Sequence, residues 1–147
     1  MYQGFLHLHN FLRWLILLAG LLTVIKAFIG WLGSKNRTNL DNILGVTFVS
    51  LLDLQVIIGF VLYFILSPVT RTVFHNFGAA MKNPGLRFYA VEHILTMVIA
   101  LVIIHLARNK EKRAATDEVK HRVTAIFYTI GLLFILVAIP WDRALFF

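Results

Sequence analysis

The stretch that decides the fold runs from Phe5 to Leu32 and reads FLHLHNFLRWLILLAGLLTVIKAFIGWL. It exceeds the roughly 20 apolar residues that an α-helix needs to cross a bilayer. It lacks the basic start of a signal peptide and is too long for a signal peptide's apolar region. The stretch therefore predicts a retained transmembrane helix, in which the polar residues are the informative positions.

Three further stretches have the same character, at about residues 43–66, 88–107 and 123–140. Over all 147 residues, 59% are hydrophobic and the mean hydropathy is +0.80, well above the norm for soluble proteins. The joining segments are too short to hold a soluble domain. We therefore predict one all-α membrane domain over residues 1–147, in which transmembrane helices at about 5–32, 43–66, 88–107 and 123–140 form an antiparallel bundle.

The second connection, residues 67–87, is not uniformly polar. Val69, Val73 and Phe77 recur at helical spacing opposite Arg71 and Lys82. Such a pattern is typical of a short helix that lies on a membrane surface. We expect this interfacial helix on the outer side, between transmembrane helices two and three.

The basic residues near the spans are distributed unevenly. Most lie at the first and third connections: Lys35, Arg37, Arg108, Lys110, Lys112, Arg113, Lys120 and Arg122. The other side has Arg71, Lys82, Arg87 and Arg143. By the positive-inside rule, the first and third connections face the cytoplasm and both termini face the periplasm of a bacterial inner membrane. The rule also explains the net charge of +7 without nucleic-acid binding.

Several ionisable or polar residues lie inside the spans. A charged group at the bilayer centre costs roughly 2.5 to 3.5 kcal/mol on insertion scales, so it usually faces a partner within the bundle. We predict a buried polar network of Asn10, Arg13, Asp53, Gln55 and Glu92. Asp53 and Gln55 are two residues apart, hence about 200° apart around a helix. One of them should face the core and the other a second interface, which favours a partner protein or a polar cavity. The expected partner is another membrane protein or, in a homo-oligomer, a second copy of the chain.

His9 and His93 lie at matching depth in the outer thirds of helices one and three. Two imidazoles on different helices can bind one b-type haem iron from opposite sides. Arg13, one turn below His9, could neutralise a haem propionate or pair with Glu92 or Asp53. In the alternative, the two histidines bind no cofactor and are hydrogen-bonding members of the polar network. The absence of cysteine excludes thiolate ligands and disulfides.

A second histidine pair lies toward the cytoplasmic side. His105 is near the end of helix three, and His121 precedes helix four. The 12-residue spacing from His93 to His105 resembles the ligand spacing of dihaem membrane cytochromes. Helix one has no second histidine on that side, so these are weaker candidates, and we interpret His121 as a solvated loop residue.

Several short motifs follow one another along the chain. They are HNFLRW at 9–14, DLQ at 53–55 with Gly59 and Tyr63, RF at 87–88 leading to VEH at 91–93, KHR at 120–122 and IPW at 139–141. In this order and spacing they resemble a family of small bacterial four-helix membrane proteins often labelled "cytochrome b". The resemblance implies an inner-membrane protein in which His9 and His93 ligate haem b.

Three functions follow as hypotheses. The first is membrane electron transfer through one haem b, with quinol or a periplasmic carrier as partner. The second is a haem-free accessory or assembly subunit of a larger membrane complex, respiratory or other. The third is a proton path or transporter through Asp53, Glu92 and the histidines. No motif pairs a nucleophile with a base, and no glycine run could bind phosphate, so we do not expect an autonomous enzyme.

Overall fold

The computed structural model describes residues 1–142, which form helices and no strand. The expected outer basic residue Arg143 lies outside the described residues. Four helical segments are long and apolar enough to cross a membrane: Tyr2–Leu32, Asn39–Leu66, Pro84–Arg113 and Asp117–Ala138. These segments are typical of a multi-pass membrane protein.

Helix α1 (Tyr2–Leu32) leads through a short connection into α2 (Asn39–Val61). α2 begins earlier than the expected residue 43 because Thr38 and Asp41 cap it reciprocally. The Asp41 N–H donates to the Thr38 hydroxyl over 3.4 Å, and the Thr38 N–H donates to the Asp41 carboxylate over 2.7 Å. Such a capping box satisfies backbone N–H groups at the helix start.

Beyond α2 the chain continues through a π-helical turn, η1 (Leu62–Leu66), into α3 (Pro68–His75), α4 (Phe77–Lys82) and α5 (Pro84–Arg87). The stretch expected to be one surface helix is thus two short helices. Asn76 separates them because its backbone leaves the helical region, at φ −147° and ψ 77°. Its side chain then accepts a hydrogen bond from the Ala79 N–H over 3.2 Å and starts α4.

A second π-helical turn, η2 (Phe88–Glu92), leads into α6 (His93–Arg113), and α7 (Asp117–Ala138) follows. The connection between the third and fourth spans, expected from about residue 108 to 122, is shorter in the structure. The helix runs on to Arg113 because no Gly or Pro interrupts it and because Arg108 and Glu111 are buried in the protein. Thr116 caps α7, which therefore begins before the expected residue 123.

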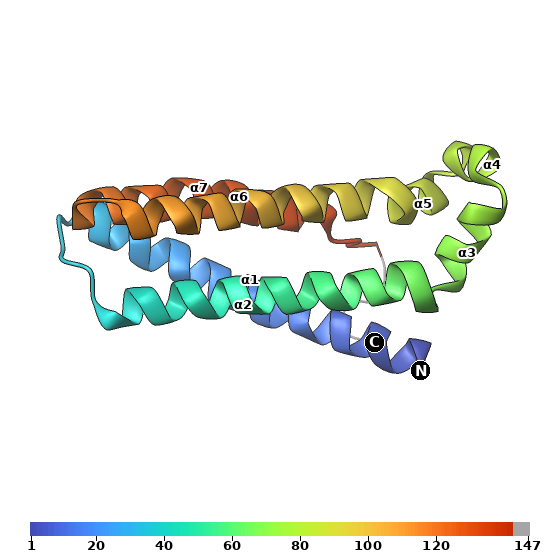
Figure 1. Ribbon diagram of the computed structural model, residues 1–147, viewed down its shortest axis with the longest axis horizontal. Helices are drawn as coiled ribbons and strands as arrows, with labels where there is room; N and C mark the ends of the chain where they lie inside the picture. Colours follow the sequence, from blue (N-terminus) through green and yellow to red (C-terminus); the bar gives the residue numbers. More distant parts are fainter. Residues whose placement is uncertain (143–147) are drawn as a thin grey trace.

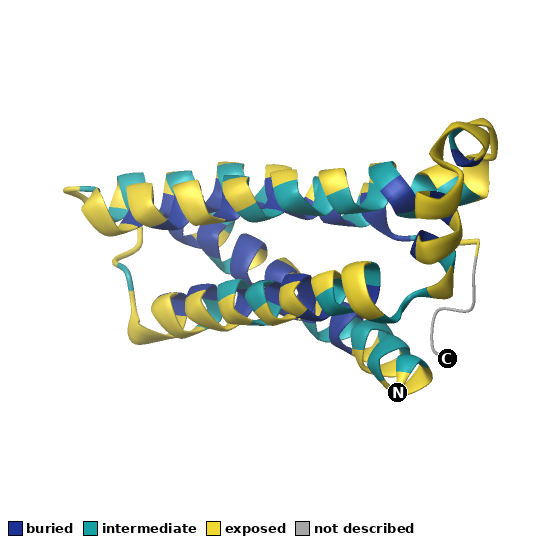
Figure 2. Ribbon diagram, turned by 45° about the vertical axis from the view of Figure 1, so that its right-hand side comes forward, coloured by how far each residue is buried: buried dark blue, intermediate teal, exposed yellow. Residues whose placement is uncertain are grey.

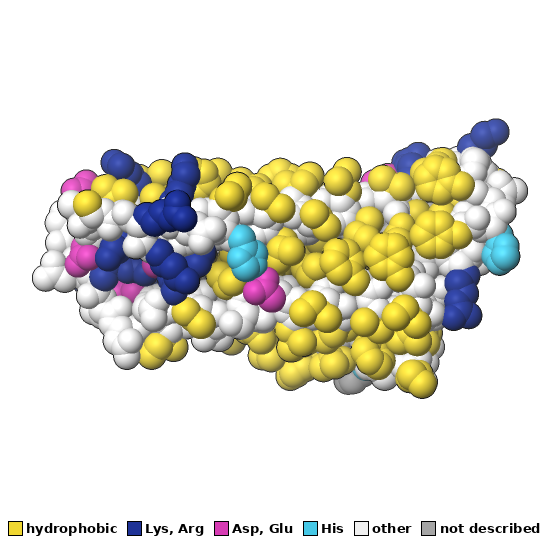
Figure 3. All heavy atoms as spheres, viewed as in Figure 1, with side chains coloured by type: hydrophobic (Ala, Val, Ile, Leu, Met, Phe, Trp, Pro, Cys, Tyr) yellow, Lys and Arg dark blue, Asp and Glu magenta, His cyan; other side chains and the backbone are white. Residues whose placement is uncertain are grey.

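The four long helices lie side by side along the longest axis of the molecule (Figure 1). α1 packs against both α2 and α7, and α6 packs along α7. Buried residues face the interior, whereas the outward faces are largely exposed (Figure 2). On the side drawn in Figure 3 the surface between the two ends is mainly hydrophobic, and more Lys and Arg lie at one end than at the other. We call this the basic end; it contains the α1–α2 and α6–α7 connections.

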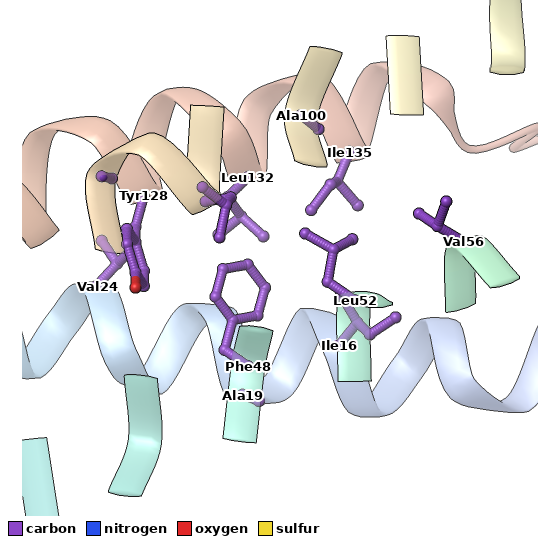
Figure 4. Packing of buried hydrophobic residues seen from close by; sticks show 12 residues of the cluster. Ile16, Ala19, Val24, Phe48, Leu52, Val56, Ala100, Tyr128, Leu132 and Ile135 are labelled. Carbon is purple, nitrogen blue, oxygen red and sulfur yellow. The ribbon is translucent and has the colours of Figure 1, made fainter. Parts of the chain in front are cut away.

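Apolar side chains fill the middle of the bundle (Figure 4). Phe48 and Leu52 of α2 meet Ile16 of α1 and Leu132 and Ile135 of α7. Close approach of α2 to α1 requires Gly20, since a Cβ there would lie 2.8 Å from the Phe48 ring. This apolar core separates the two polar regions of the molecule described below.

Candidate functional site

The half of the bundle opposite the basic end contains a cavity of about 320 Å³. Its wall comes mainly from α1, α2 and α6, with η1, α3 and the end of α7 completing it. The size is within the range of small-molecule and cofactor sites. Most of the wall is apolar, and its polar side chains include His9, Asn10, Arg13, Gln55 and His93.

His9 and His93 both line the cavity and lie close to each other. Their ring centres are 6.2 Å apart and the ring planes make an angle of 69°. His93 is oriented by a hydrogen bond of 2.7 Å between its Nδ1 and the carbonyl oxygen of Ala138. Since the carbonyl can only accept, Nδ1 carries the proton and Nε2 of the neutral ring keeps its lone pair. The structure therefore brings together the two residues that the sequence singled out as ligands.

His9 is positioned mainly through its backbone. Its carbonyl oxygen accepts a 2.9 Å hydrogen bond from Gln55 Nε2. The ring's Nδ1 is buried and has no hydrogen-bond partner among the described residues. A Cβ at Gly59 would lie 3.4 Å from His9 Cε1, an ordinary contact distance, so α2 passes close to the ring. The described residues thus leave the buried Nδ1 of His9 open to a ligand.

Arg13 is buried, at 8% exposure, and lines the same cavity one turn from His9. Its guanidinium carbon lies 5.7 Å from the centre of the Trp14 ring, within the range of a cation–π interaction. A buried cation beside two histidines gives the cavity a positive wall. An anionic group bound in the cavity would be stabilised there.

The predicted buried network is only partly present. Asn10, Arg13 and Gln55 line the cavity, but Glu92 and Asp53 lie elsewhere. Glu92 is 47% exposed and accepts a 2.7 Å hydrogen bond from Arg87 Nε. Asp53 is 42% exposed and pairs with His105. The geometry of α2 explains the difference, since the buried Gln55 faces the core and Asp53 points to the other side of the helix.

The two weaker histidine candidates lie on different surfaces. His105 faces outward beside Asp53, at 46% exposure. His121 is 1% exposed, so its interpretation as a solvated loop residue was wrong. Gly30 of α1 allows its burial, because a Cβ there would lie 2.3 Å from the ring. His121 Nε2 lies 3.1 Å from the carbonyl oxygen of Lys35, which ties α7 to the α1–α2 connection.

Sequence reasoning missed a second polar region, the basic-end cluster of Arg37, Asn42, Arg108 and Glu111. Arg108 Nη1 donates to both carboxylate oxygens of Glu111 at 3.0 Å, and its Nη2 donates to Asn42 Oδ1 at 2.6 Å. Arg37 also donates to Glu111. The sequence feature that could have revealed this cluster is the i, i+3 spacing of Arg108 and Glu111 in a stretch without Gly or Pro.

Tyr63 was also missed as a site residue. Its hydroxyl donates a 2.7 Å hydrogen bond to the carbonyl oxygen of Ala90. This bond joins η1 to η2, the π-helical turn that immediately precedes His93. π-helical turns within α-helices are frequent at functional sites. Their presence was not readable from residue patterns.

Searches of protein-family models, of curated proteins and of solved structures each found no significant match to this chain.

Proposed function

We propose that this chain is a membrane electron-transfer protein that binds one haem b in the cavity, where His9 and His93 would hold the iron. The observation that supports this most directly is the spacing of the two rings. Imidazole nitrogen binds a transition metal at about 2 Å, which puts two rings on opposite sides of one metal roughly 6 Å apart. The ring centres of His9 and His93 are 6.2 Å apart.

The small number of possible metal ligands also favours haem over a free metal ion. Residues 1–142 contain no group of three or more His, Cys, Asp or Glu side chains that could hold a metal. A structural zinc site requires four protein ligands and a catalytic one three. A porphyrin supplies the remaining ligands itself, so two histidines suffice.

The surrounding residues have separate roles in this proposal. When bound, the haem would supply a one-electron redox centre. The Ala138 carbonyl holds the His93 ring and raises its basicity, as an outer hydrogen-bond partner commonly does for a metal ligand. Gln55 fixes the backbone of His9, and Gly59 lies beside its ring. Arg13 would neutralise a propionate of the bound haem, which would lower the cost of its own burial.

We further propose that the helices cross a bacterial inner membrane as an antiparallel bundle, with the basic end in the cytoplasm. Both termini and the cavity then belong to the periplasmic half, and α3 and α4 lie at the outer interface. The concentration of Lys and Arg at one end supports this orientation (Figure 3). Quinol in the membrane or a periplasmic carrier is the electron-exchange partner.

The apolar core favours this function over a proton path. The cavity and the basic-end cluster are on opposite sides of Phe48, Leu52 and their neighbours. Proton transfer across the bundle requires a chain of polar groups or water. A haem near one face needs no such chain.

The test is an absorption spectrum of the purified protein with a pyridine haemochrome assay, using cells that supply haem. We expect a Soret band in the wild type that is lost in His9→Ala and in His93→Ala. His7→Ala and His75→Ala are matched controls, since both residues are exposed, and should keep the band. A colourless wild-type protein would refute haem binding and favour the haem-free accessory subunit.

A further inference from the structure

Asp53 and His105 form an ionisable pair on the outside of the bundle. His105 Nε2 donates to Asp53 Oδ1 over 2.6 Å and joins α6 to α2. The side chains are 46% and 42% exposed. Within the described part of the chain, neither side chain makes another hydrogen bond. One carboxylate oxygen and one ring nitrogen therefore remain available to a neighbour.

The pair lies at membrane depth. Asp53 is in the middle of the 28-residue span Asn39–Leu66. Lipid chains offer no hydrogen-bond partner, and a charged side chain at this depth costs roughly 2.5 to 3.5 kcal/mol on insertion scales. Ionisable residues in transmembrane segments usually face other protein or a water-filled cavity, whereas this pair faces outward.

Apolar side chains surround the pair. On α2, Ile57 and Phe60 follow Asp53 at helical spacing and are exposed. On α6, Val102 and Leu106 flank His105 and are exposed as well. Ser50, one turn before Asp53, is exposed on the same side of α2. We call this α2–α6 face, defined by Ser50, Asp53, Ile57, Phe60, Val102, His105 and Leu106, the pair face.

We propose that the pair face binds a second copy of this chain in a two-fold symmetric dimer. In a two-fold symmetric interface, if one residue of the first copy contacts a different residue of the second copy, the same contact is made with the two copies exchanged. The pair face presents an acid and a base side by side, so it is complementary to itself. A helix of another protein would need its own acidic and basic side chains at the two positions that face Asp53 and His105.

In such a dimer, the number of hydrogen-bond donors on the two imidazolium rings equals the number of carboxylate oxygens that accept. An imidazolium ring donates from both nitrogens, and a carboxylate accepts at both oxygens. The Asp53 Oδ2 of each copy accepts from His105 Nδ1–H of the other, while the Nε2–H to Oδ1 bond within each copy remains. Two carboxylates and two imidazolium rings then form a closed ring of hydrogen bonds with no net charge. This dimer does not depend on haem binding, so the two proposals are tested separately.

The absence of cysteine makes cross-linking a clean test. We expect Ser50→Cys to give a disulfide-linked product with the mass of two chains when native membranes are mildly oxidised. Leu133→Cys, on the exposed side of α7, is the matched control and should stay monomeric. A product with any other mass would identify a different partner and overturn the proposal, as would a Ser50→Cys chain that remains monomeric.

Exchange of the paired residues tests the self-complementarity. In the Ser50→Cys chain, Asp53→His alone and His105→Asp alone should each lower cross-linking about tenfold, because charge-assisted hydrogen bonds are lost. Co-expression of the two variants with different tags should restore cross-linking between unlike chains, since each then supplies what the other lacks. The doubly exchanged chain, Asp53→His with His105→Asp, should cross-link as well as the parent. If neither combination restores the dimer, the proposal is wrong.

Discussion

Replacing Glu111 by alanine should destabilise the bundle by about 3 kcal/mol, at the lower end of the roughly 3–5 kcal/mol measured when one partner of a buried ion pair is removed. Glu111 accepts hydrogen bonds from Arg108 and Arg37. The side chains of Glu111, Arg108 and Arg37 are only 4%, 10% and 13% exposed. We choose the lower end because the cluster lies near an end of the bundle, where both arginines can turn toward water.

The assay is reversible unfolding in mixed micelles, with a denaturing detergent as titrant and helix content measured by circular dichroism. The matched control is Glu118→Ala, at an exposed position of the same end, which should change the free energy of unfolding by no more than about 0.5 kcal/mol. In an Arg37→Ala background, Glu111→Ala should cost less, because one of its partners is already gone. Equal effects of the Glu111 and Glu118 substitutions would refute the buried cluster.

Two further substitutions test how the helices hold the histidines. Gly30→Ala should lower the thermal unfolding midpoint, at a cost of about 1–3 kcal/mol, because its Cβ would lie 2.3 Å from the buried His121 ring. The same change at Gly4, where no atom lies within 4 Å, should be neutral or stabilising, and a midpoint gain for Gly30→Ala would contradict the packing. Gln55→Leu removes the 2.9 Å hydrogen bond to the His9 carbonyl and should cost about 1 kcal/mol or less, because the Gln55 Oε1 is already without a partner. Unfolding in mixed micelles measures this cost, and a loss above about 3 kcal/mol would show that Gln55 has a larger role.

Much of the site was predictable because depth in a membrane is a function of position along a helix. His9 and His93 were expected at the same level, and their rings lie 6.2 Å apart. Asp53 and Gln55 were expected on different sides of one helix, and they are. Which of the two faced the core was not predictable, since both are polar and the choice depends on how α2 packs.

The errors arose where a charged residue was assigned to the interior or to water from its position in the sequence alone. Glu92 was placed in the interior, but it pairs with Arg87 at the surface. The charged run after Ala107 was interpreted as a loop, but Arg108 and Glu111 satisfy each other inside the protein. Composition cannot distinguish these cases, because a charge is stable wherever it has a partner.

The sequence by itself determined four helices long and apolar enough to cross a membrane and the position of each polar group along them, because helix length and rise per residue are fixed by backbone geometry. Only the tertiary structure decided which polar groups meet, because helix rotation is set by packing at positions such as Gly20 and Gly30. Glycine at these positions lets Phe48 and His121 approach the neighbouring helix. The neighbouring rings of His9 and His93 and the outward pair of Asp53 and His105 both follow from that packing.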